Sequence, residues 1–114
     1  MGPFLFNREK KLLYDLAASE NLWDRRIAIV STWWFIRHGK IDDTLLIAQK
    51  LLFDKEDLIH KAVGWMLREV GKRNPEALVS FLSVYHSVMP RTMLRYAIEK
   101  FAADVRKQYL KAQK

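Results

Sequence analysis

Apolar side chains recur at every third or fourth position along nearly the whole chain, and this spacing places them on one face of an α-helix. No stretch alternates apolar and polar residues with the period of two that a half-buried β-strand requires. The pattern therefore predicts an all-α protein. Seven helices are expected, over residues 8–19, 22–38, 42–52, 55–72, 75–85, 90–101 and from 104 onward.

Several helix ends carry sequence signals. The run Asn74-Pro75-Glu76 predicts the start of the fifth helix, because proline is tolerated in a first turn and a carboxylate there meets the helix dipole favourably. Gly39 is expected to end the second helix, since glycine readily adopts the left-handed conformation found just past a helix. Three short polar residues are expected to cap the helices that follow them: Asn7, Asp42 and Asp54.

A weak internal repeat groups the helices in pairs. The second helix of each pair carries a basic residue shortly before an alanine, and the alanines Ala28, Ala62 and Ala97 are separated by 34 and then 35 residues. This period and the pairing predict an α-solenoid of HEAT-like antiparallel helix pairs, about three pairs followed by a C-terminal helix. An irregular helical bundle is the alternative. No linker composition divides the chain, so residues 1–114 are expected to form one domain.

Tryptophan and basic residues share one side of the second, fourth and sixth predicted helices. On the second helix the residues at steps of three and four are Trp23, Arg26, Val30, Trp33 and Arg37. The corresponding residues are Leu58, Lys61, Trp65, Arg68 and Lys72 on the fourth helix, and Arg91 and Arg95, joined by Thr92, on the sixth. Because the second helices of successive pairs line one surface of a solenoid, these stripes predict a basic groove with an aromatic floor.

The formal net charge of +7 favours a polyanionic partner. In such a groove, arginine and lysine would bind the phosphates of a nucleic acid, and tryptophan would offer stacking or cation–π contacts. Aromatic residues at helical spacing are more often part of the core. We therefore expect packing roles for Trp23, Trp33 and Trp34 on the second helix, and for Met93, Tyr96, Ala97 and Phe101 on the sixth.

Trp65 has a distinctive neighbour. It follows Gly64, and glycine inside a helix costs about 1 kcal/mol relative to alanine. Such a cost makes sense where another backbone or a ligand must approach closely. The nearby Arg68 and Glu69 have a simpler interpretation, as members of a solvated face with salt bridges along the helix.

Other kinds of chemistry have little support in the composition. The chain has no cysteine, and His38, His60 and His86 lie far apart, so neither a disulfide framework nor a dedicated metal site is expected. No phosphate loop or nucleophile elbow occurs, and no cofactor is expected. Charges interrupt every apolar run before it reaches the roughly 20 residues needed to cross a bilayer. These features predict a cytoplasmic protein.

Three blocks of the sequence resemble bacterial DNA alkylation-repair glycosylases of the AlkD type. The blocks are Glu20–Ala28, Leu58–Glu69 and Met89–Glu99, in this order, and the resemblance extends over nearly the whole chain. It implies HEAT-like repeats curved around duplex DNA and cleavage of the glycosidic bond of cationic alkylpurines such as 7-methylguanine and 3-methyladenine. By the same resemblance, Arg26 matches an active-site arginine and Trp65 an aromatic residue that faces the lesion.

The chain also departs from the family's pattern. Members of this family carry an N-terminal half with the catalytic aspartate in a Trp-Asp-type segment, and this chain does not contain it. The chain is therefore expected to be the C-terminal half of a longer glycosylase domain, inactive or weakly active alone. It is expected to self-associate or to pair with a missing N-terminal half. The alternative function is a non-catalytic helical-repeat module that binds nucleic acid or an acidic protein.

The candidate functional residues follow from the stripes and from the resemblance together. Arg26 and Trp65 are the candidates for the active site. The partner is expected to be double-stranded DNA containing alkylated bases, and the candidate DNA contacts are Arg25, Arg37, Lys61, Arg68, Arg91, Thr92 and Arg95.

Overall fold

The computed structural model describes residues 11–111, and every regular element in that range is helical. Residues 11–17 form a first helical segment, which six longer or comparable helices follow. Their bounds are α2 (Leu22–Arg37), α3 (Asp42–Lys50), α4 (Asp57–Arg73), α5 (Pro75–Tyr85), α6 (Arg91–Ala97) and α7 (Ala103–Lys111). The predicted all-α class is confirmed.

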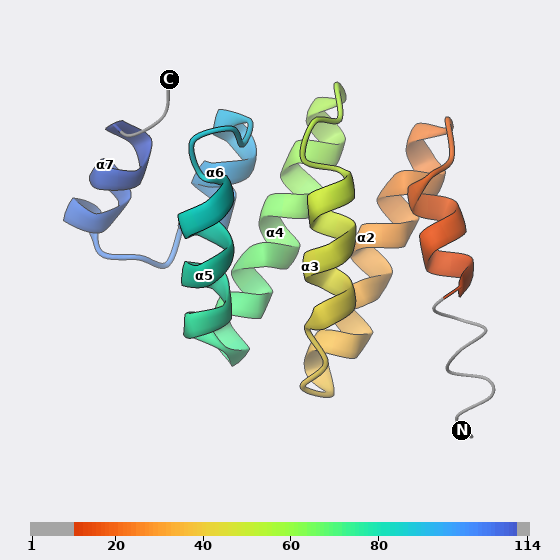
Figure 1. Cartoon of the computed structure of the whole chain (residues 1–114), viewed down its shortest axis with the longest axis horizontal. Helices are drawn as coiled ribbons and strands as arrows, with labels where there is room; N and C mark the ends of the chain where they lie inside the picture. Colours follow the sequence, from red (N-terminus) through yellow and green to blue (C-terminus); the bar gives the residue numbers. More distant parts are fainter. Residues whose placement is uncertain (1–10, 112–114) are drawn as a thin grey trace.

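The helices form two layers, as an α-solenoid requires. The segment over residues 11–17, α3 and α5 lie in one layer, and α2, α4 and α6 lie behind them in the other (Figure 1). Each pair therefore contributes one helix to each layer, and α7 follows at the end of the stack. The molecule measures 44 × 29 × 18 Å along its principal axes, with the longest dimension along the direction of stacking. The predicted α-solenoid is confirmed.

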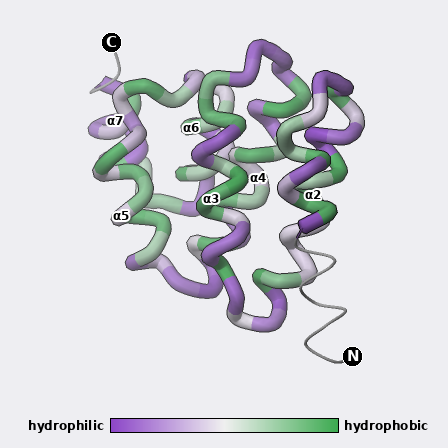
Figure 2. The backbone as a smooth tube through the Cα atoms, turned by 45° about the vertical axis from the view of Figure 1, so that its right-hand side comes forward, coloured by the Kyte–Doolittle hydropathy of each residue, from purple (hydrophilic) through white to green (hydrophobic). Residues whose placement is uncertain are grey.

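The core lies between the two layers and is organised around α4, which contacts α2, α3, α5 and α6. Along each helix, apolar and polar positions are interleaved, not separated into blocks (Figure 2), so each helix turns one apolar side toward this core. The three repeated alanines Ala28, Ala62 and Ala97 are all buried. Small residues at equivalent positions allow α2, α4 and α6 to approach one another, which explains the repeat seen in the sequence.

Gly64 marks the closest approach between α4 and α6. A Cβ atom placed on Gly64 would lie 2.5 Å from the Cβ of Tyr96 and 2.6 Å from the backbone carbonyl oxygen of Met93. Real Cβ atoms do not come this close to other atoms. Of the two explanations for this glycine, the structure shows the first: another backbone occupies the space that a side chain would need.

Two of the predicted helix ends agree with the structure. Gly39 has a φ of 76° just beyond α2, as expected for a residue in the left-handed region. Asn74 precedes α5, and its side chain accepts a hydrogen bond from the N–H of Ala77 at 3.1 Å, with Pro75 in the first turn. The predicted cap Asn7 lies outside the described residues.

Two other predicted caps are wrong. Asp42 is the first residue of α3 and does not cap it, since Ile41 occupies the cap position without a side-chain hydrogen bond. Asp54 lies three residues before α4, whose cap position is taken by Glu56. The carboxylate of Asp54 instead binds Arg25 and the N–H of Glu56. A short polar residue near a helix start is therefore recruited by the strongest available partner, which here is a guanidinium from another helix.

The sixth helix is shorter than predicted. It ends at Ala97 and not near Phe101, because the chain turns over residues 98–100, where the N–H of Phe101 donates to the carbonyl oxygen of Ile98 at 2.9 Å. This turn reverses the chain and lets α7 lie beside α6. The prediction missed the turn because no glycine or proline marks it.

The three tryptophans expected in the core are exposed. The buried side of α2 carries Ala28, Ile29, Thr32, Phe35 and Ile36, and this choice of face leaves Trp23, Trp33 and Trp34 outside it, with Trp23 58% exposed. Trp33 and Trp34 pack along their own helix instead: the guanidinium of Arg37 lies 4.8 Å from the Trp33 ring centroid, and the Trp34 ring lies 4.2 Å from that of His38. The prediction of core packing is wrong for all three.

Arg25 ties α2 to the loop between α3 and α4. Its Nε donates to the Asp54 carboxylate at 2.7 Å, and its Nη1 donates to the backbone carbonyl oxygens of Ser19 and Glu20 at 3.1 and 2.8 Å. The side chains are 15% exposed for Arg25 and 7% for Asp54. This ion pair is largely shielded from water, so it has a structural role in joining two helix pairs.

Tyr14 links the first helical segment to α3. Its hydroxyl donates to the Asp43 carboxylate at 2.7 Å, and the Lys50 ammonium lies 5.9 Å from its ring centroid. Burial, together with the hydrogen bond and the negative charge of Asp43, raises the pKa of Tyr14 from 10.0 to about 12. The neutral hydroxyl is therefore held in the folded state over a range of pH in which it ionises in the unfolded chain.

The Tyr14 hydroxyl is expected to make stability depend on pH above 10. Because the pKa is higher in the folded state, the contribution is complete below pH 10 and is lost as the pH rises toward about 12. The difference in unfolding free energy between the wild type and Tyr14→Phe should therefore shrink between pH 8 and pH 11.5. Urea unfolding at both values measures it, and a difference that stays constant would contradict the role of the hydroxyl.

None of the described helices combines the length and apolar character needed to cross a membrane. Over residues 11–111, no three His, Asp or Glu side chains lie close enough together to hold a metal ion.

Candidate nucleic-acid interface

A pocket of about 330 Å³ opens between α2, α4 and α6, and we call it the central pocket. It contains four of the candidate functional residues: Arg26, Lys61, Trp65 and Arg68. Its lining consists of Arg26, Leu58, Lys61, Ala62, Trp65, Arg68 and Tyr96. Residues that are separated by up to 70 positions in the chain thus meet, because α4 packs against both α2 and α6.

Two aromatic side chains shape this pocket, and the contact at Gly64 places them together. Trp65 follows Gly64 on α4, while Tyr96 on α6 has its Cβ directly above Gly64. Trp65 is 37% exposed and Tyr96 38% exposed, so neither is a core residue. The expectation that Tyr96 is buried is wrong, although Met93 and Ala97 on the same helix are buried as expected. Phe101, also expected in the core, is partly buried against it.

Three cations border the central pocket, and they differ in how far they are neutralised. Arg26 forms no ion pair with any residue in the described range. Lys61 pairs with Asp57 at 3.2 Å, but both side chains are well exposed and such a pair is weak in water. Arg68 is held by the carboxylate of Glu99 and lies 3.9 Å from that of Glu69. Arg26 and Lys61 are therefore the cations most available to an anion.

Arg68 has a second role in addition to its charge. It extends from α4 to Glu99, which lies just after α6, so the ion pair fastens the two helices on the side of the pocket. Both interpretations of Arg68 from the sequence thus apply in part. It lines the groove, and it also takes part in the salt bridges of its own helix.

Three other predicted DNA contacts lie away from the central pocket. Arg25 is occupied by Asp54 and two backbone carbonyl groups. Arg37 lies three helical turns beyond Arg26 on α2, roughly 16 Å along the helix axis, and packs over Trp33. Arg91 is the exposed first residue of α6 and borders neither of the cavities described here.

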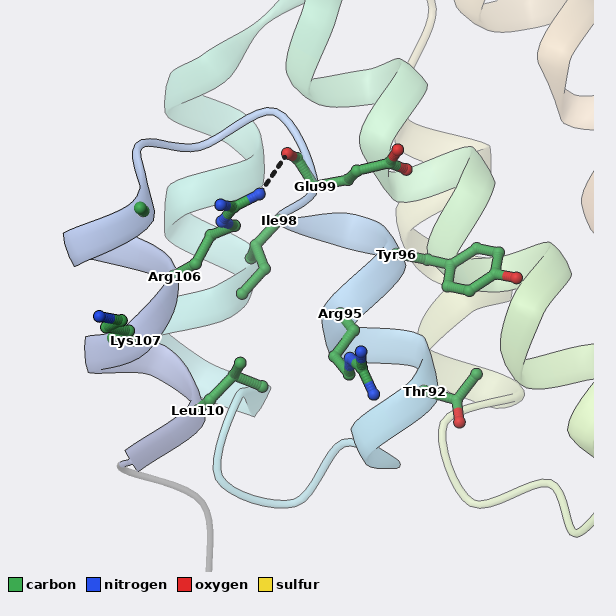
Figure 3. A pocket seen from close by; sticks show the side chains of 9 residues that line it. Thr92, Arg95, Tyr96, Ile98, Glu99, Arg106, Lys107 and Leu110 are labelled. Carbon is green, nitrogen blue, oxygen red and sulfur yellow. Dashed lines mark hydrogen bonds between the residues drawn. The ribbon is translucent and has the colours of Figure 1, made fainter.

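Thr92 and Arg95 border a second and larger cavity, of about 710 Å³, which we call the α6–α7 cleft. Figure 3 shows Arg95 and Thr92 on α6, with Arg106 reaching toward Glu99 from α7. Tyr96 extends from α6 toward α4, on the side opposite α7 (Figure 3). Since Tyr96 borders both cavities, the α6–α7 cleft and the central pocket adjoin one another.

Three residues at these sites are not among the functional candidates predicted from the sequence: Tyr96, Arg106 and Lys107. Tyr96 lies four residues after Thr92, so the helical spacing could have placed it on the same side as that hydroxyl. Arg106 and Lys107 belong to the predicted C-terminal helix, for which the sequence indicates no neighbour. No local pattern shows that α7 folds back beside α6, because that depends on the turn over residues 98–100.

The composition of the central pocket indicates what it can bind. Indole and phenol rings offer flat faces to a nucleobase, and the guanidinium and ammonium groups offer hydrogen bonds to phosphate oxygens. Among the described residues, no carboxylate lines this pocket. The arrangement therefore suits binding of an aromatic group attached to a phosphate backbone.

A comparison with known protein families shows which family the sequence is similar to. A family model described as a DNA alkylation repair enzyme matches residues 1–101 of the chain. No curated protein and no solved structure gives a match. The family match spans all residues of the central pocket, and it ends before α7 begins at Ala103.

Proposed function

This chain belongs to the DNA alkylation repair enzyme family, and we propose that it binds duplex DNA at alkylated purines, with the lesion facing the central pocket. The observation that carries the proposal is the meeting of Arg26, Lys61 and Trp65 in one pocket, which also contains Tyr96. The substrates would be cationic bases such as 7-methylguanine and 3-methyladenine, as the resemblance to AlkD-type glycosylases implies.

The chemistry of these substrates fits a pocket without an acid. A purine alkylated at N7 or N3 already carries a positive charge, so it leaves the sugar readily and needs no protonation. The faces of Trp65 and Tyr96 would attract the cationic base by cation–π contact. Arg26 would hold a phosphate beside the lesion by charge-assisted hydrogen bonds. Binding of the lesion thus requires only groups that line the pocket.

Excision makes a further demand on the site. As the base leaves, the sugar gains positive charge, and a carboxylate is the usual group to stabilise it and to orient the attacking water. None of the described side chains that line the central pocket is a carboxylate. We therefore propose that this chain recognises the lesion efficiently and that, acting alone, it releases the base slowly.

The Arg26→Ala and Trp65→Ala variants test this proposal. Each is expected to weaken binding to a duplex containing 7-methylguanine by about tenfold, which corresponds to roughly 1.4 kcal/mol and to the loss of one phosphate contact or one stacked ring. Both side chains are exposed, so the fold should be retained. Fluorescence anisotropy with a labelled duplex gives the affinities, and circular dichroism checks the helix content.

Lys50→Ala serves as the matched control. Lys50 is an exposed cation on α3, in the other layer of the molecule. Its removal changes the net charge by the same amount as Arg26→Ala, and it should change the affinity by less than about twofold. Equal losses for Lys50→Ala and Arg26→Ala would show that only the overall charge matters. Equal affinity for damaged and undamaged duplex, without base release, would indicate a non-catalytic nucleic-acid-binding module.

A further inference from the structure

The α6–α7 cleft carries more positive charge than its ion pairs neutralise. Arg95, Arg106 and Lys107 border it, and Glu99 is the carboxylate among its lining residues. The carboxylate of Glu99 is already bound to Arg68 on α4. Within the described range, neither Arg95 nor Lys107 forms an ion pair. The cleft therefore presents cations to an anion from outside the protein.

The position of Arg106 shows how this charge is kept in place. Its Nη1 donates to the backbone carbonyl oxygen of Glu99 at 3.2 Å, a contact that leaves its other nitrogen atoms available (Figure 3). The guanidinium is thus held beside the turn between α6 and α7, and its charge is not neutralised by this contact. A cation that is oriented by a neutral partner retains its full charge for a second ligand.

The cleft presents several groups that can bind a backbone phosphate. At about 710 Å³ it is larger than the central pocket, and its lining combines three cationic side chains with the apolar residues Ile98, Ala103 and Leu110. The Thr92 hydroxyl adds a donor to the cationic groups. Tyr96 borders both cavities, so a strand that places its base in the central pocket would pass next to the cleft.

We propose that the α6–α7 cleft is a second DNA contact, in which Arg95 and Lys107 bind backbone phosphates next to the lesion site. This inference rests on the proposed function, and it adds α7 to the DNA-binding surface. The family match ends at residue 101, so Lys107 and Arg106 belong to a part of this chain that the match does not include. The occupant is the phosphate backbone of duplex DNA, and the contact does not depend on base sequence or damage.

The salt dependence of DNA binding tests the proposal. The logarithm of the affinity falls linearly with the logarithm of the salt concentration, with a slope of about −0.9 for each phosphate neutralised. Arg95→Ala and Lys107→Ala should each reduce the magnitude of this slope by roughly 0.9, on both damaged and undamaged duplexes. Each should also lower the affinity about three- to tenfold at moderate salt. Anisotropy titrations with a labelled duplex at four salt concentrations give these values.

Controls separate this inference from the proposed function. Both substituted residues are exposed, so the variants should fold, and Lys50→Ala controls for the loss of one charge elsewhere. If Arg26→Ala and Trp65→Ala weaken lesion binding while Arg95→Ala and Lys107→Ala keep the wild-type slope, the second contact is refuted and the proposed function stands. If the wild type binds no duplex DNA, both fail. A slope reduced to the same extent by Lys50→Ala would also refute a localised contact.

Discussion

Gly64→Ala is expected to lower the unfolding free energy by about 3 kcal/mol, the upper part of the usual range for an overpacked core. The added Cβ would lie 2.6 Å from the carbonyl oxygen of Met93 and 2.5 Å from the Cβ of Tyr96. Both atoms belong to the backbone of α6 or are attached directly to it, so no side-chain rotation relieves the overlap. The two helices must separate. Urea unfolding followed by circular dichroism measures the loss.

Gly71→Ala is the matched control on the same helix. There the added Cβ would meet the Cδ2 atom of Leu78 at 2.5 Å, and this atom is the end of a leucine side chain, which can shift without moving the backbone. Alanine is also favoured over glycine inside a helix by up to about 1 kcal/mol, which offsets the adjustment of Leu78. The unfolding free energy should therefore change by less than about 1 kcal/mol. Comparable losses for both variants would mean that the approach of α6 to Gly64 is not the cause.

The separation of α4 and α6 should also be seen in binding. Tyr96 has its Cβ above Gly64, and it forms a wall of the central pocket beside Trp65. A helix shift at this point would move the phenol ring relative to the indole, so Gly64→Ala should weaken lesion binding even under conditions in which the variant is fully folded. Gly71→Ala should bind like the wild type. Gly64 thus determines both how closely α4 packs against α6 and the shape of the central pocket.

The architecture could be predicted from the sequence because it depends on periodic features. The apolar spacing fixed the helix class, and the alanines at 28, 62 and 97 indicated the repeat and are buried in the structure. One prediction that failed, the cap at Asp54, lies where a tertiary contact competes with a local signal. Asp54 resembles a helix cap, but Arg25 from another helix takes its carboxylate. Such competition is decided by neighbours far along the chain, which no local pattern contains.

The candidate site was predictable to the extent that it follows helical spacing. Arg26, Lys61 and Trp65 were placed on one side of their helices by steps of three and four, and the structure brings them into one pocket. The exposed tryptophans of α2 show the limit of this reasoning. Spacing identifies the residues on one face of a helix, but it does not show whether that face packs against the core. On α2 the smaller residues Ala28 and Ile29 are buried, and Trp33 remains outside.

Arg25→Ala is expected to lower the unfolding free energy by about 3 kcal/mol, because it leaves the charge of Asp54 without its partner. The Asp54 side chain is only 7% exposed, so water cannot readily replace the guanidinium. The variant also removes two hydrogen bonds to the carbonyl oxygens of Ser19 and Glu20, which fasten the start of α2. Chemical denaturation measures the loss, and the Lys61→Ala variant, which breaks an exposed pair, should lose less than about 1 kcal/mol.

A double variant and a binding measurement identify the cause of that loss. Arg25→Ala combined with Asp54→Ala should be more stable than Arg25→Ala alone, because no shielded charge then lacks a partner. At temperatures where Arg25→Ala is folded, its affinity for lesion DNA should lie within about twofold of the wild type, whereas the neighbouring Arg26→Ala should bind about tenfold more weakly. A large loss of DNA affinity in folded Arg25→Ala would instead assign Arg25 to the DNA-binding surface. Two adjacent arginines would then share a function, although in the structure only Arg26 lines the central pocket.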